Sequence, residues 1–212
     1  MKDVIVLVGK NGAGKGSRLS ELLEGREDQF MKVSTSILLK REIAKGTEVG
    51  KQIEAYRSAS KLVPDEIVNP LVINAIKSAD KTVIIDGFPR TLGQAEAMIE
   101  AGIQPKMVIE IYLDDEIVME RLSDRICCES CTEPYTMSSY NPPKVPGICD
   151  KCGGKLARRK DDEPEAIKQR LDDYREKTYP VLDYFSCNGS EVVVVDNSNG
   201  KQALKDLEEL IL

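Results

Sequence analysis

The stretch Gly9-Lys10-Asn11-Gly12-Ala13-Gly14-Lys15-Gly16-Ser17 decides the fold of this chain. It follows a short apolar run at 4–8 and precedes sequence compatible with a helix. Its glycines permit backbone conformations closed to other residues, so that successive N–H groups and a helix N-terminus converge on a polyanion. We therefore predict a phosphate-binding loop, in which Lys15 adds a mobile cation for the outer phosphates. The strict pattern has Ser or Thr directly after the lysine, whereas here the hydroxyl arrives at Ser17. The alternative is an ordinary glycine-rich turn.

Length and composition favour one globular domain with small insertions. The chain has 212 residues, of which 41% are hydrophobic and 31% charged, and its formal net charge is −6. The one extended basic run is Arg158-Arg159-Lys160. Nonspecific nucleic-acid binding requires a basic surface, so we expect no nucleic-acid partner and predict small anionic ligands instead.

The N-terminus gives no sign of export. Met1-Lys2-Asp3 leads directly into a five-residue apolar run, which is too short for the core of a signal peptide, and no segment approaches the length of a membrane span. We expect a cytoplasmic protein with no membrane contact.

The patterning along the chain alternates strands with helices, which predicts an α/β fold with a parallel sheet covered on both faces. The expected strands are 4–8, 30–33, 82–86, 107–113 and 192–195. The expected helices are 17–23, 36–45, 49–60, 65–79, 91–101, 115–125, 164–185 and 201–212. Pro70 lies inside one of them and predicts a late start or a bend there.

The segment 126–160 breaks the pattern, because it is rich in Cys, Pro, Gly and Ser and has no helical period. Its cysteines form two Cys-x-x-Cys pairs, Cys128 with Cys131 and Cys149 with Cys152. Four thiolates at this spacing predict a structural zinc site without an open position for catalysis. Two disulfides are the alternative, and Cys127 competes with Cys128 as the first ligand.

A second group of polar residues follows the strand at 82–86, where the sequence reads Asp86-Gly87-Phe88-Pro89-Arg90 and then Gln94. A carboxylate at the carboxyl end of a parallel strand, beside the strand of the phosphate-binding loop, is well placed to hold magnesium through water. Arg90 would reach across the same crevice. The alternative is a Gly-Pro turn that carries a surface arginine.

With these motifs the chain resembles the adenylate kinases, in their bacterial form with a long zinc-binding lid. The resemblance rests on the loop with Lys-Gly-Ser, on Asp86-Gly-Phe-Pro-Arg90 with Gln94, and on the cysteine insertion, and it extends nearly end to end. It implies a P-loop kinase core with a five-stranded parallel sheet, a helical AMP-binding insertion and a lid. The implied bounds are 1–33, 64–124 and 163–212 for the core, 34–63 for the AMP-binding part and 125–162 for the lid.

The resemblance also implies an activity, which is reversible phosphoryl transfer from Mg-ATP to AMP to give two ADP, by a monomer. The residues it implies for the ATP site are Gly12, Ala13, Gly14, Lys15, Gly16, Ser17, Arg121, Arg125, Gly200 and Lys201. Those implied for the AMP site are Thr35, Lys40, Lys61, Leu62, Val63, Gly87, Phe88, Pro89, Arg90, Gln94, Arg159 and Arg170. The catalytic set among them is Lys15, Arg90, Arg125, Arg159 and Arg170, with Asp86 holding magnesium through water. Asp161 and Asp162 match carboxylates that help to hold the closed lid.

The AMP-binding part departs from the family pattern. Where the family usually has Ser-Thr-Gly-Asp-Met-Leu-Arg, this chain has Ser34-Thr35-Ser36-Ile37-Leu38-Leu39-Lys40, and Ser60 replaces a usual glycine. A lysine keeps the charge of an arginine but loses its bidentate fork, so we expect weaker AMP binding. Two alternative functions follow, a kinase for another nucleoside monophosphate and a noncatalytic ATP-binding sensor. A nucleic-acid-binding zinc ribbon would need the basic or aromatic surface that this chain lacks.

Overall fold

The computed structural model describes residues 2–59, 61–131, 133–137, 141–158 and 162–212. It divides the chain into two compact units. The first unit comprises Met1–Leu113 and Asp173–Leu212, and the second comprises Asp114–Asp172.

The first unit alternates strands and helices. Its elements are β1 (Val4–Val8), α1 (Lys15–Leu22), β2 (Phe30–Ser34), α2 (Thr35–Ala44), α3 (Glu48–Ser58), α4 (Asp65–Lys77), β3 (Thr82–Asp86), α5 (Leu92–Glu100), β4 (Met107–Tyr112), η2 (Tyr174–Thr178), α8 (Pro180–Cys187), β8 (Glu191–Asp196) and α9 (Gly200–Ile211). The second unit consists of α6 (Asp115–Ser123), β5 (Arg125–Cys128), β6 (Pro134–Thr136), β7 (Leu156–Arg158) and α7 (Pro164–Asp173), whose last residue joins the first unit. No helix among the described residues is long and apolar enough to cross a membrane.

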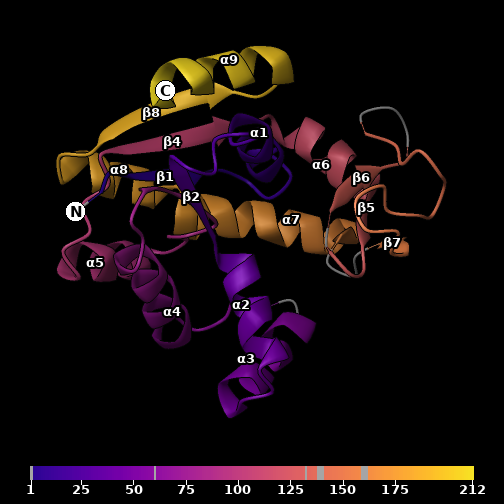
Figure 1. Cartoon of the computed structure of the whole chain (residues 1–212), viewed down its shortest axis with the longest axis horizontal. Coiled ribbons are helices and arrows are strands. Elements are labelled where there is room, and N and C mark those ends of the chain that lie inside the picture. The colour runs from indigo at the N-terminus through magenta and orange to yellow at the C-terminus, as the bar shows by residue number, and fades with distance from the viewer. Residues whose placement is uncertain (1, 60, 132, 138–140, 159–161) are drawn as a thin grey trace. The chain divides into compact units, whose positions relative to one another are not determined.

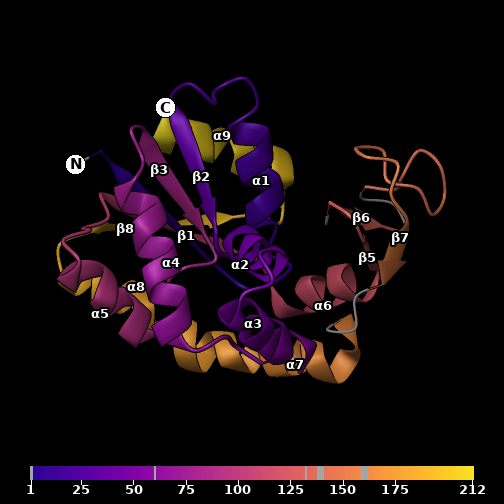
Figure 2. The same cartoon turned by 60° about the horizontal axis from the view of Figure 1, so that its bottom comes forward.

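The five strands of the first unit form one parallel sheet in the order β2-β3-β1-β4-β8 (Figures 1 and 2). The central strand β1 consists of five apolar residues, all of them buried, as a strand covered on both faces requires. The edge strand β8 is more exposed. The predicted five-stranded parallel sheet flanked by helices is confirmed.

Helices cover both faces of this sheet. Helices α1 and α9 pack together on one face, whereas α4, α5 and α8 lie on the other (Figure 1). The largest side chains that are fully buried in the core cluster include Phe88, Met98 and Phe185. Phe88 lies two residues after the end of β3, so the core anchors the segment that carries the candidate site.

The register of the sheet brings three strand ends to one edge. Leu7 of β1 and Ser34 of β2 both pair with Asp86 of β3. The loop after β1, the helix that begins at Thr35 and the turn after Asp86 therefore leave the sheet side by side. In parallel α/β sheets the carboxyl ends of the strands are where ligands bind.

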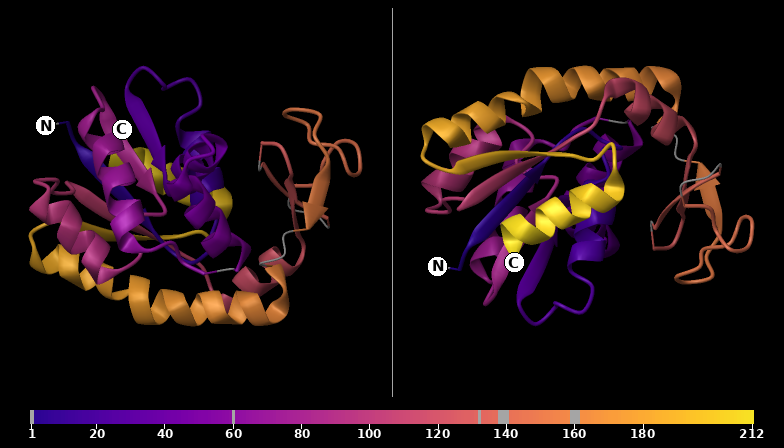
Figure 3. Two further views of the ribbon diagram at one scale, coloured as in Figure 1. Left: turned by 90° about the horizontal axis from the view of Figure 1, so that it is seen from below. Right: turned by 90° about the horizontal axis from the view of Figure 1, so that it is seen from above.

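The second unit contains a small antiparallel sheet in the order β6-β5-β7, which Figure 3 shows with its connecting loops. The sequence predicted only an irregular insertion here. Strands of three or four residues are too short to show an alternating pattern, so the sequence could not reveal them. Their buried cluster consists of Cys128, Tyr135, Cys149 and Leu156.

One prediction about a helix was wrong, and for a second helix one of two predicted alternatives is excluded. The single helix expected at 164–185 is divided into α7, the π-helical segment η2 and α8. Pro180, the first residue of α8, has no N–H to donate, and the N–H of the preceding Tyr179 bonds the carbonyl of Tyr174 five residues back at 2.7 Å. Helix α4 begins at Asp65 despite Pro70, so its start is not late.

Candidate active site

The glycine loop joins β1 to α1, as predicted, and its backbone needs glycine at specific positions. Gly14 has φ 92° and forms the N-cap of α1, a left-handed conformation that other residues adopt at a cost. At Gly9 an added Cβ would lie 2.5 Å from the carbonyl oxygen of Ile111. The start of the loop therefore lies against the end of β4, and the loop leads into the N-terminus of α1. A glycine loop that ends at a helix N-terminus is a geometry that binds phosphate.

Lys15 is the first residue of α1, and its side chain folds back over the loop. Its ammonium group donates to the carbonyl oxygens of Gly9 at 2.6 Å and Lys10 at 2.8 Å. The cation thus lies above the same backbone whose N–H groups form the anion-binding loop. Lys10 is held to Leu113 through its own ammonium group, at 2.7 Å.

Asp86 ends β3 beside this loop. A Cβ added to Gly16 would lie 3.6 Å from Oδ2 of Asp86, so the carboxylate lies against the first turn of α1. A side chain at position 16 would intervene between the carboxylate and the helix. The residues therefore fit a hydrated magnesium ion at the edge of the loop.

The turn after Asp86 organises the next group of predicted residues. The carbonyl oxygen of Gly87 accepts from Oγ1 of Thr35 at 3.0 Å and from Nε of Arg90 at 3.1 Å. Gly87 has φ 88°, and an added Cβ would lie 3.2 Å from Nη2 of Arg90. Oγ1 of Thr178 in η2 donates to the carbonyl of Arg90 at 2.9 Å, so η2 holds the end of this turn. The structure thus brings Thr35, Gly87 and Arg90 together.

Gln94 lies in the first turn of α5 and is buried, with 5% of its surface exposed. Its Oε1 accepts from the backbone N–H of Arg90 at 2.7 Å, and its Nε2 donates to Oδ1 of Asp65 at 2.7 Å. The backbone N–H of Gln94 bonds Oγ1 of Thr91, the N-cap of the helix. Oγ1 of Thr91 in turn donates to Oδ2 of Asp65 at 2.8 Å.

The other residues predicted for AMP are distributed between core and surface. Phe88, Pro89 and Val63 are buried, and the Phe88–Pro89 peptide is cis. Lys40 lies half-buried on α2, whereas Lys61 and Leu62 are exposed in the segment before α4.

Residues near the C-terminus contact the phosphate-binding loop. Nδ2 of Asn197, a buried residue after β8, donates to the carbonyl of Ala13 at 2.7 Å. Nη1 of Arg18 donates to the carbonyl of Gly200 at 2.7 Å, and Arg18 also pairs with Glu21. The structure therefore places Gly200 beside α1, and Lys201 next to it is exposed.

In the second unit, Asp162 holds two of the predicted arginines. Its carboxylate is fully buried and accepts from Nε of Arg125 at 2.8 Å, from Nη2 of Arg125 at 2.6 Å and from Nη2 of Arg170 at 2.8 Å. The fork of Arg125 thus binds both oxygens, which is the strong bidentate geometry. Arg121 lies in the last turn of α6. Arg159 and Asp161 lie outside the described residues.

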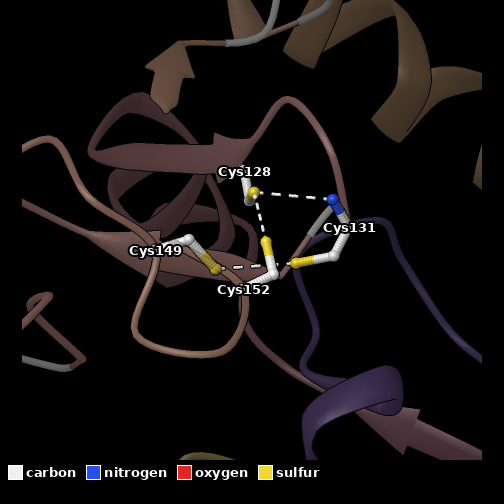
Figure 4. Close-up of side chains that lie close together, drawn as sticks. All are labelled: Cys128, Cys131, Cys149 and Cys152. Carbon is white, nitrogen blue, oxygen red and sulfur yellow. Dashed lines mark hydrogen bonds between the residues drawn. The ribbon is translucent and has the colours of Figure 1, made fainter. Parts of the chain in front are cut away.

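The four predicted thiols of the second unit converge (Figure 4). All four sulfur atoms lie within 4.8 Å of one another, with Cys128 3.4 Å from Cys152 and Cys131 3.5 Å from Cys149. Four thiolates about 2.3 Å from one zinc ion place their sulfurs about 3.8 Å apart, so the cluster fits a tetrahedral metal. A disulfide needs sulfur atoms about 2.05 Å apart, and no cysteine among the described residues forms one. Cys128, and not Cys127, supplies the first thiol.

Hydrogen bonds favour the thiolate form at two of these cysteines. Burial acts to raise the pKa of Cys149, but hydrogen bonds from Tyr135 and from the backbone N–H groups of Cys152 and Lys151 lower it to about 6. The backbone N–H of Cys131 lowers the pKa of Cys128. Donors aimed at a sulfur stabilise its negative charge, which is the state a metal binds.

Three partners of the site were missed by sequence reasoning: Asp65, Asn197 and Tyr135. Each acts through a neighbour, Asp65 on Gln94, Asn197 on the loop and Tyr135 on Cys149. Asp65 follows Pro64 at a helix start, where an acidic residue is ordinary. Nothing in the sequence distinguished any of the three from a surface or core residue.

Comparison with known proteins gives consistent matches. A family model described as adenylate kinase matches residues 7–190. An adenylate kinase from Syntrophomonas wolfei is 36% identical over 211 residues, which cover 97% of each chain. One from Staphylococcus aureus is 37% identical over 214 residues, covering 98% of this chain and 96% of its own. One from Thermodesulfovibrio yellowstonii is 39% identical over 191 residues, covering 87% of each chain.

Proposed function

The chain belongs to the adenylate kinase family, and we propose that it transfers the terminal phosphoryl group of Mg-ATP to AMP, giving two ADP. One observation supports this most directly. The phosphate-binding loop, the Asp86 carboxylate and the Thr35–Gly87–Arg90 network leave the same edge of one parallel sheet. A donor triphosphate and an acceptor monophosphate need such adjacent places, since their reacting groups must approach within bonding distance.

The donor nucleotide binds at the loop. The backbone N–H groups of residues 12–17 hold its phosphates, and Lys15 exchanges its bonds to Gly9 and Lys10 for the outer phosphates. Asp86 would hold Mg²⁺ through water; the ion, when bound, neutralises charge on the phosphate oxygens. The base lies near Gly200 and Lys201, where Arg18 now bonds the carbonyl of Gly200.

The acceptor nucleotide binds along the turn after β3. Thr35 and Gln94 contact the adenine, while Arg90 and Lys40 bind the phosphate. The backbone of residues 61–63 and 87–89 lines this site. Lys40 presents one point charge where the family has an arginine fork, so AMP binds with the lower affinity that we expected from the sequence.

Four further arginines bind the donor's base and the phosphates of the two nucleotides. Arg121 and Arg125 bind the donor's base and phosphates, and Arg159 and Arg170 bind the phosphates of both nucleotides. Arg125 and Arg170 share Asp162, which keeps their guanidinium groups oriented. Planar donor forks hold phosphates in line and disperse the charge of the transferring group. Closure of the 125–162 lid excludes water, which would otherwise take the phosphoryl group.

No general base is required for this reaction. A monophosphate oxygen is already anionic at neutral pH, so it can attack without losing a proton. The chain contains no histidine, and this composition is compatible with the mechanism. Catalysis consists of positioning and electrostatic stabilisation, both of which the loop and the arginines provide.

The four-cysteine cluster holds zinc as a structural ion of the lid. All four positions are filled by protein, so the ion would have no open coordination site for substrate. It stabilises a small sheet whose strands have only three or four residues. As in the family generally, we expect the chain to act as a monomer.

The test measures ADP formation from Mg-ATP with AMP, GMP, CMP or UMP offered in turn. We expect turnover with AMP and its loss in Lys15→Ala, because that variant lacks the cation over the loop. Lys205→Ala, which removes an exposed lysine from α9, is the matched control. Preference for another monophosphate would change the acceptor but keep the mechanism. Binding of ATP without turnover of any acceptor would support a sensor, and near-normal activity of Lys15→Ala would exclude the loop's assigned role.

A further inference from the structure

Gln94 is held at both ends of its side-chain amide. Its oxygen accepts from the N–H of Arg90 and its nitrogen donates to Asp65, each at 2.7 Å. Arg90 N–H can only donate, and a carboxylate can only accept. Rotating the amide by 180° would set a donor against a donor at Arg90 and an acceptor against the Asp65 carboxylate. Both neighbours therefore enforce the same orientation.

Asp65 is itself fixed in position. Its second oxygen accepts from Oγ1 of Thr91 at 2.8 Å, and Thr91 is also the N-cap that accepts from the backbone N–H of Gln94. The carboxylate thus links the first turn of α4 to the first turn of α5. An added Cβ at Gly93 would lie 3.4 Å from the same carboxylate oxygen, so the carboxylate lies against the first turn of α5.

The held amide has one N–H and one oxygen lone pair left for a ligand. Adenine presents an acceptor at N1 and a donor at its 6-amino group, which match this pair. A 6-oxopurine presents the opposite order, a donor at N1 and an acceptor at O6. It could pair with Gln94 only if the amide turned over, which both neighbours oppose.

We propose that Asp65 is a specificity-determining positioning residue, which locks the Gln94 amide in the orientation that accepts 6-aminopurine and rejects 6-oxopurine monophosphates. This inference rests on the proposed function, in which Gln94 contacts the acceptor base. It goes beyond that assignment because the discrimination comes from a carboxylate that needs no contact with the nucleotide.

A merely structural role for Asp65 predicts a different outcome. Asp65 is an acidic residue in the first turn of α4, where it also interacts favourably with the helix dipole. Losing that charge would lower stability and reduce turnover of all acceptors alike. The ratio of kcat/KM for AMP to that for IMP is insensitive to such a uniform loss, so it is the quantity to measure.

Asp65→Asn is the informative variant, because asparagine is isosteric and can donate to a turned amide while still accepting from Thr91. The wild type should prefer AMP over IMP by about 100-fold or more. In Asp65→Asn we expect the ratio to fall about tenfold, mainly through a lower KM for IMP. The fall is partial because the N–H of Arg90 still opposes rotation. Glu66→Gln removes the neighbouring exposed acid of the same turn and should keep the wild-type ratio. An equal ratio in the two variants would overturn the proposal.

A nucleotide series on the wild-type chain provides a test that requires no variant to fold. Purine riboside monophosphate keeps the N1 acceptor but has no group at position 6. A locked amide predicts the order AMP, purine riboside monophosphate, IMP, since IMP sets its N1–H against the amide N–H. A freely turning amide predicts that IMP is used as well as AMP, which would contradict the lock.

Equilibrium binding of the same three nucleotides by calorimetry distinguishes failure of the proposed function from failure of the amide lock. Absence of ADP formation from AMP in the wild type would reject the proposed function. The order of the three dissociation constants would still decide whether the amide is locked.

Discussion

Asp162→Asn tests whether one buried carboxylate organises the arginines of the second unit. The carboxylate has no exposed surface and accepts three hydrogen bonds from Arg125 and Arg170, at 2.6 to 2.8 Å. If the asparagine oxygen keeps the two bonds to the Nη2 atoms, its amide nitrogen replaces Oδ2 and faces Nε of Arg125, donor against donor. The variant therefore loses at least one charge-assisted bond and the negative charge between two cations.

A hydrogen bond to a charged group contributes about 1.5–3 kcal/mol, and breaking a buried ion pair costs about 3–5 kcal/mol. The side chains of Arg125 and Arg170 are 18% and 17% exposed. Water can therefore stabilise part of their unpaired charge, which lowers the cost of breaking the ion pair. We expect a loss of about 3 kcal/mol in the free energy of unfolding of the second unit. For a unit of this size, Asp114–Asp172, that corresponds to a decrease of roughly 12–24 °C in Tm.

Differential scanning calorimetry of the zinc-loaded protein can follow the transition that contains this unit. Asp173→Asn is the matched control, because it removes a carboxylate, 27% exposed, that pairs with Lys177 at 2.6 Å. That pair is accessible to water, so its loss should cost less than about 0.5 kcal/mol. A cost for Asp162→Asn as small as that of the control would refute the role assigned to the buried carboxylate.

Three further predictions concern the acceptor site and the lid. Lys40→Arg should lower the KM for AMP about fivefold by restoring a bidentate donor, as steady-state kinetics would show; no change, or a loss of activity, would mean that the pocket is adapted to another ligand. Chelation of zinc should unfold the second unit's small sheet while the first unit stays folded. Among the described residues, the buried cluster of that sheet contains only Tyr135 and Leu156 besides cysteines, so the sheet depends on the metal. A thermal melt unaffected by chelator, with no zinc found by mass spectrometry, would disprove the site. Tyr135→Phe should speed zinc loss to a chelator about tenfold, since Tyr135 contacts Cys149 at 3.5 Å, whereas a rate equal to that of Tyr179→Phe would show that this contact is unimportant.

The sequence by itself determined the sheet of the first unit and the places of its strand ends. Strands buried on both faces are typically continuous apolar runs, and β1 and the buried part of β3 appear as such in the sequence, whereas Glu110 interrupts the run of β4. The glycine loop and the two Cys-x-x-Cys pairs are also local, because their chemistry depends on spacings of a few residues. Local spacing therefore sufficed to predict the phosphate-binding loop and the four-thiol cluster.

Only the tertiary structure decided which side chains hold the site in place. Asp65 reaches Gln94 across 29 positions of sequence, and Asn197 reaches Ala13 across 184. The short strands β5–β7 likewise depend on pairing between distant segments. Hydrogen-bond partners at such separations leave no periodic pattern, because each depends on how whole helices and strands pack. The sequence predicted the groups that carry the chemistry, and packing selected the groups that orient them.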